Sequence, residues 1–121
     1  MTKLLIVSSD SLYTKVISTA LQGPQVEIAH IDPSQCLLEK CQNYHTELII
    51  FLSLAPYFTS MNIIEHLREV LTEMPAIYVI AHSHSQSTIL SLLECGVTQY
   101  MTFPINLYRL RNKVYTLLSH N

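Results

Sequence analysis

Hydrophobic positions in this chain follow two alternating patterns. Short runs rich in Ile, Val, Leu and Tyr are typical of strands, and they cover Leu4–Val7, Val26–His30, Leu48–Leu52, Ala76–Ala81 and Gln99–Thr102. The longer stretches between them repeat apolar residues every three or four positions, as amphipathic helices do. In the first of these stretches we expect Leu12, Val16, Ile17 and Ala20 to share the buried face and Thr14 to lie on the opposite face.

The alternation of strand and helix, repeated five times, predicts a parallel sheet with helices on both faces. Three of the runs are almost wholly apolar, as strands covered on both faces are, whereas Val26–His30 alternates and Gln99–Thr102 is partly polar. These two are therefore expected at the edges of the sheet. The chain of 121 residues fits one domain, residues 1–121. The predicted fold is α/β and flavodoxin-like, a (βα)5 doubly wound parallel five-stranded sheet with strand order 2-1-3-4-5.

Several residues are typical of helix ends. Asp10 precedes the first helical stretch and is expected to be its N-cap, because Asp is among the residues preferred there. Asp32-Pro33 predicts another helix start, and Asn106 is expected to cap the last helix. Gly96 is a predicted helix terminator.

Composition and charge exclude several classes of function. The net charge of −2 gives no electrostatic reason for this domain to bind nucleic acid, and the apolar run near the start is too short for a signal peptide or a membrane span. The three cysteines lack the spacing of a metal site and predict reduced thiols in the cytoplasm. Only two glycines are present, which disfavours a dinucleotide or flavin site. No cofactor, metal or enzymatic activity is expected.

A site is expected where the strands end, because ligands of doubly wound sheets bind at the carboxyl ends of the strands. Four segments should meet there, namely Ser8–Asp10, Leu52–Ser53, Ala81–His82 and Phe103-Pro104. Asp10 supplies the only carboxylate in these four segments.

Over nearly its full length, the chain resembles the receiver domain of two-component response regulators, the CheY-like superfamily. The resemblance rests on the spacing of the apolar runs, on Pro56 four residues after Leu52, and on the segment GVTQYMTFPI. That segment keeps the family's glycine, aromatic residue and proline as Gly96, Tyr100 and Pro104. Tyr100 corresponds to the aromatic residue that changes position when a receiver is activated.

The resemblance fails where a receiver carries its chemistry. Ser8 and Ser9 occupy the positions of the acidic pair, and Leu52 occupies that of the phosphoacceptor aspartate. Ala81 replaces a Thr or Ser, and Phe103 replaces a lysine. Phosphoryl transfer needs a carboxylate nucleophile, acidic ligands for Mg²⁺ and a cation that stabilises the product. We therefore expect a pseudo-receiver whose pocket is filled by apolar packing that includes Leu52 and Phe103.

Partner contacts are predicted from the resemblance. Receivers of transcription regulators commonly form homodimers through the fourth helix, fifth strand and fifth helix, which here include Gln99, Tyr108, Arg109, Arg111, Lys113 and Tyr115. The expected context is a bacterial DNA-binding transcription regulator, with any effector domain beyond residue 121. One alternative is a stand-alone adaptor that binds a partner protein. Another is a flavodoxin-like ligand or metal sensor that uses His82, His84 and Asp10.

Overall fold

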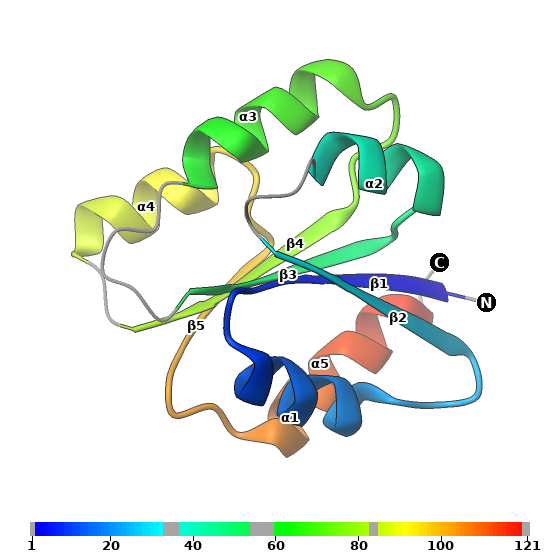
Figure 1. The fold of residues 1–121 in the computed structure, drawn as a ribbon. Helices are drawn as coiled ribbons and strands as arrows, with labels where there is room; N and C mark the ends of the chain where they lie inside the picture. The colour runs from blue at the N-terminus through cyan, green and yellow to red at the C-terminus, as the bar shows by residue number, and fades with distance from the viewer. Residues whose placement is uncertain (1, 33–36, 54–59, 83–84, 120–121) are drawn as a thin grey trace.

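The computed structural model describes residues 2–32, 37–53, 60–82 and 85–119. Strands and helices alternate along the chain (Figure 1). The strands are β1 Thr2–Val7, β2 Val26–Ile31, β3 Leu48–Ser53, β4 Ala76–Ala81 and β5 Gln99–Thr102. The helices are α1 Ser11–Leu21, α2 Leu37–Tyr44, α3 Ser60–Val70, α4 Gln86–Glu94 and α5 Leu107–Ser119.

All five strands are parallel and lie in the order β2-β1-β3-β4-β5. This confirms the predicted flavodoxin-like order, including the edge positions of β2 and β5. The register pairs Val7 with Ile31 and with Phe51, and it pairs Ala81 with Ser53 and with Thr102. The carboxyl ends of the strands therefore meet along one edge of the sheet.

Two apolar cores lie on opposite faces of the sheet, because successive side chains of a strand point to opposite faces. Leu52 belongs to the core that packs against α1 and α5, whereas Phe51 belongs to the core that packs against α2, α3 and α4. Figure 1 shows these two groups of helices on either side of the sheet. The central strands β1, β3 and β4 are mainly apolar because both of their faces are covered.

Three predicted helix ends are confirmed. The Asp10 carboxylate accepts a hydrogen bond from the Tyr13 N–H at 2.8 Å, and the Asn106 side chain accepts one from the Arg109 N–H at 3.1 Å. Gly96 follows the end of α4 with φ of +121°, the left-handed conformation that glycine adopts without strain. The predicted helix start at Asp32-Pro33 falls partly outside the described residues.

The buried face predicted for α1 is right for Ile17, which is fully buried, and wrong for Leu12, Val16 and Thr14. Leu12 and Val16 are 69% and 37% exposed, and the buried residues are Thr14, Ile17 and Leu21. Burial of Thr14 is possible because its hydroxyl donates a hydrogen bond to the Asp10 carbonyl at 2.6 Å. The polar side chain therefore carries no unsatisfied group into the core.

None of the helices in the described part of the chain is both long and apolar enough to cross a membrane.

Candidate functional site

Ser8, Ser9 and Asp10 follow β1 at the edge of the sheet where the site is predicted. Ser8 is buried, with 1% of its surface exposed, whereas Ser9 is exposed. The Ser8 hydroxyl accepts a hydrogen bond from the Asp10 N–H at 2.9 Å and lies 3.2 Å from the Asp10 carbonyl, to which it can donate. Ser8 therefore closes a local turn that leads into α1. The Asp10 carboxylate caps that helix, so both polar groups already have partners in the backbone.

Leu52, the last residue but one of β3, lies inside the apolar core. It is 6% exposed and belongs to the cluster against which Phe103 packs. Ala81, at the end of β4, is fully buried on the opposite face of the sheet. The two positions that the resemblance assigns to the acceptor aspartate and to the phosphate-following hydroxyl thus hold buried alkyl groups.

Aromatic rings gather around Phe103 at the same edge. The Phe103 ring centroid lies 4.8 Å from that of Tyr13 on α1 and 5.3 Å from that of His82 after β4. The ring planes are tilted by 56° and 42°, arrangements that aromatic pairs favour. The Phe103 N–H donates to the Ala81 carbonyl at 3.1 Å, and the Phe103-Pro104 peptide bond is cis. The sequence did not predict whether this peptide bond is cis or trans.

Tyr100 is held against the segment that follows β4. Its hydroxyl donates a hydrogen bond to the His82 carbonyl at 3.1 Å, and its ring packs against the core under α2, α3 and α4. This hydrogen bond joins Tyr100 of β5 to His82, whose ring contacts Phe103.

Sequence reasoning missed two contributors to this edge. Tyr13 was not singled out, although it lies three residues after the N-cap, where the first turn of α1 returns to the edge of the sheet. His30, the last residue but one of β2, was not predicted to contribute. Its Nε2 lies 2.8 Å from the Ser8 carbonyl oxygen, and since a carbonyl only accepts, the imidazole donates this hydrogen bond. Asp32 follows β2 at this edge too and is exposed.

The chemistry available to the described residues is limited. They contain no group of three or more His, Cys, Asp or Glu side chains placed to hold a metal ion. His84, part of the alternative sensor hypothesis, lies outside the described residues. The edge instead presents an aromatic cluster, a capped helix and a buried leucine.

The predicted partner face divides into two groups of residues. Arg111 donates hydrogen bonds to the Ala20 and Gln22 carbonyls at 2.7 and 2.9 Å, and the Tyr115 hydroxyl donates to the Leu21 carbonyl at 2.8 Å. The Arg111 guanidinium also lies 4.3 Å from the centre of the Tyr115 ring. These two side chains bind the C-terminal end of α1, where carbonyl groups lack helical partners.

The other residues of the predicted partner face range from partly buried to exposed. Tyr108 is 80% exposed, Arg109 and Lys113 are exposed, and Gln99 is partly buried. Two leucines of α4 on the other side of β5, Leu90 and Leu93, are 58% and 42% exposed. Exposed apolar surface therefore flanks the β5 edge on both helices.

Comparison with solved structures finds the same fold in response-regulator receiver domains. A CheY-like receiver domain protein from Methanospirillum hungatei superposes with a TM-score of 0.81 at 19% identity, covering 99% of this chain and 95% of its own. A signal receiver domain from Bermanella marisrubri gives 0.77 at 21% identity, covering 98% and 99%. The Vibrio cholerae chemotaxis protein CheY4 gives 0.79 at 20% identity, covering 96% and 98%.

No protein-family model matches the chain, and no curated protein matches it. At these sequence identities the structural likeness is one of fold. The chain thus has the CheY-like fold, a parallel α/β sheet of order 2-1-3-4-5, with the edge contacts described above.

Proposed function

We propose that this chain is a receiver-like signalling domain that works without phosphorylation and catalyses no reaction. One observation carries the proposal: Leu52, at the position the resemblance assigns to the phosphoacceptor, is 6% exposed and part of an apolar core. An alkyl side chain cannot accept a phosphoryl group, and its burial in the core replaces the hydrated acidic site that Mg²⁺ requires.

The remaining groups of the edge support the same proposal. Asp10 uses its carboxylate to cap α1, and the Ser8 hydroxyl is bonded within the turn before it. Ala81 has no hydroxyl with which to follow a phosphate. The Tyr100 hydroxyl donates a hydrogen bond to the His82 carbonyl. On this proposal the surface around β5 keeps one arrangement, and partner proteins read that arrangement.

An NMR titration tests the loss of phosphate chemistry. Amide shifts of Ser8, Ser9, Asp10 and Leu52 are followed while Mg²⁺ and then beryllofluoride, the acyl-phosphate mimic, are added. We expect no saturable change at these four residues. A saturable shift confined to them would mean that Asp10 still organises a metal site, and the proposal would have to be abandoned.

For the output we propose a homodimer formed through α4, β5 and α5, within a cytoplasmic DNA-binding transcription regulator. The support is the exposed apolar surface on either side of β5, carried by Leu90, Leu93 and Tyr108. Aromatic residues such as Tyr108 commonly dominate the binding energy of interfaces. A contact of this kind needs no phosphate in order to form.

Sedimentation velocity over a range of protein concentrations tests the dimer. We expect reversible self-association that Tyr108→Glu weakens about tenfold or more, since a charge in a packed contact must be desolvated. Leu12→Glu is the matched control, because Leu12 is 69% exposed on α1, a helix outside the proposed interface. A monomer at all concentrations, or equal weakening by both variants, would refute the dimer; a monomer would favour the adaptor alternative.

A further inference from the structure

The helix α4 is less deeply embedded in the domain than the neighbouring α3. Of its nine residues, all of which the structure describes, only Leu92 is buried, whereas α3 places Ile64 and Leu67 in the core. Leu90 and Leu93 of α4 are 58% and 42% exposed. An isolated helix of this length is unstable in water. The position of α4 therefore depends on contacts made by other parts of the chain.

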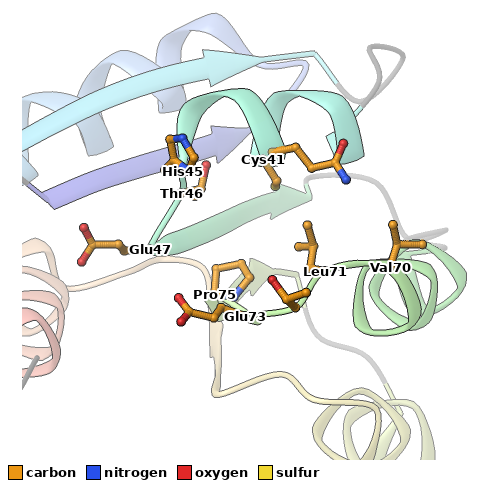
Figure 2. A pocket seen from close by; sticks show the side chains of 10 residues that line it. Cys41, His45, Thr46, Glu47, Val70, Leu71, Glu73 and Pro75 are labelled. Atoms are coloured by element: carbon orange, nitrogen blue, oxygen red, sulfur yellow. The ribbon is translucent and has the colours of Figure 1, made fainter.

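Arg68 of α3 makes one of these contacts. It lies just before Val70, which ends the helix and is labelled in Figure 2. The Arg68 guanidinium donates a hydrogen bond from Nη1 to the Cys95 carbonyl at 2.7 Å, and Cys95 is the C-cap of α4. The last carbonyls of a helix carry partial negative charge, so a cation is favourable there. This charge-assisted hydrogen bond thus connects the two helices at the C-terminal end of α4.

The chain after α4 leaves room for Arg68. Gly96 has a φ of +121°, and a Cβ atom at this position would lie 3.3 Å from the Arg68 Cδ atom. The Gly96 N–H donates to the Leu93 carbonyl at 3.3 Å, and the Val97 N–H donates to the Leu92 carbonyl at 3.1 Å. These two bonds form a Schellman motif. The Cys95 carbonyl is not used by this motif and accepts from Arg68 instead.

The other end of α4 is closed by its own residues. The Ser85 hydroxyl accepts a hydrogen bond from the Thr88 N–H at 3.2 Å and lies 2.9 Å from the Thr88 hydroxyl. These contacts lie within the first turn and join α4 to no other element. Arg68 and the buried Leu92 therefore both hold α4 near its C-terminal end.

We propose that the hydrogen bond from Arg68 controls a local opening of α4, in which α4 leaves the sheet while the other elements stay folded. Without this bond, the main remaining anchor of α4 is Leu92. The consequence for self-association rests on the proposed function, because α4 carries Leu90 and Leu93 of the proposed dimer interface. An open α4 removes both leucines from that interface.

Native-state amide hydrogen exchange, followed by NMR at increasing urea concentrations, tests the opening. We expect the amides of residues 89–93 to exchange about tenfold or more faster than those of β1 and β4. Their rates should hardly depend on low concentrations of urea, because a local opening exposes little new surface. The protein is kept at a concentration at which it sediments as a monomer, so the outcome is independent of the proposed dimer.

Variants at Arg68 assign the opening to its hydrogen bond. Arg68→Met removes the donor and should speed exchange of residues 89–93 about tenfold, the usual effect of one hydrogen bond to a charged group. Arg68→Lys keeps a cationic donor and should give an intermediate rate. Lys15→Met removes an exposed cation from α1 and should leave the rate unchanged. The proposal is overturned if residues 89–93 exchange with the rate and urea dependence of β1 and β4, or if Arg68→Met leaves their rate unchanged.

Discussion

Replacing Leu52 by aspartate tests whether water reaches the predicted apolar pocket. Leu52 is 6% exposed, so nearly the whole side chain loses its apolar burial, which contributes about 2 kcal/mol or somewhat more. Aspartate is smaller than leucine, so some cavity forms as well, and the charge adds a further cost. Leu52→Asn provides the matched neutral variant, because it differs from Leu52→Asp only in ionisation.

The cost of the charge has an upper limit. A carboxyl group that stays protonated in the folded protein loses about 1.4 kcal/mol for each pH unit above its unfolded pKa of about 3.9. At pH 7 the penalty can therefore reach about 4 kcal/mol beyond that of the asparagine variant. The sign follows from linkage: burial raises the folded pKa of an acid, so stability is greatest below the unfolded pKa and is lost as the pH rises toward the folded one.

Urea unfolding of the parent, Leu52→Asn and Leu52→Asp at pH 5, 6 and 7 provides the measurement. We expect Leu52→Asp to be less stable than Leu52→Asn at pH 7, and the gap to narrow by about 1.4 kcal/mol per pH unit on acidification. The reasoning would be refuted if both variants were as stable as the parent, or if their difference were independent of pH. Either result would mean that water reaches the end of β3.

Three further predictions follow from contacts elsewhere in the chain. Tyr115→Phe should lower the free energy of unfolding by about 1 kcal/mol, because the end of α1 loses a donor; chemical denaturation measures this, and Tyr108→Phe, at an exposed position, should have no effect. Asp10→Ala should cost about 1 kcal/mol through loss of the N-cap, measured in the same way; equal stability would contradict the capping role. Cys41, whose thiol pKa is raised to about 11 by burial, should resist iodoacetamide at pH 8 in the native protein and react in urea, as peptide mass spectrometry would detect.

The fold could be predicted because the composition of each strand indicates whether both of its faces are buried. Strands covered on both faces need apolar residues at every position, and strands at an edge do not. The structure extends β1 to Thr2, where Lys3 pairs with Glu27 of β2. Charged residues at the start of an outer pair of strands remain accessible, so the apolar pattern alone did not include them.

Which face of α1 is buried could not be predicted from the spacing of its apolar residues. Two helical stripes were compatible with the sequence, one through Leu12 and Val16 and one through Thr14, Ile17 and Leu21. The structure buries the second, because a threonine whose hydroxyl bonds to the preceding turn behaves as a small apolar side chain. Hydrophobicity favoured the stripe that is more exposed in the folded domain.

The contacts of the candidate site were predictable only in part. Positions at the strand ends follow from topology, and Asp10 as an N-cap follows from local preference. The ring contacts of Phe103 with Tyr13 and His82 join segments far apart in sequence, and no local pattern contains them. The same holds for Arg111 and Tyr115, whose partners on α1 lie about ninety residues earlier.

The bonds from α5 to the end of α1 also constrain how the domain is made. During synthesis α1 emerges early, but the donors for its last carbonyls emerge only with Arg111 and Tyr115. Until then the apolar face through Ile17 and Leu21 lacks Leu110 and Val114, with which it shares a core. A chain that ends before α5 thus lacks both these donors and part of the core that α1 shares, and we expect it to be less stable than the full domain.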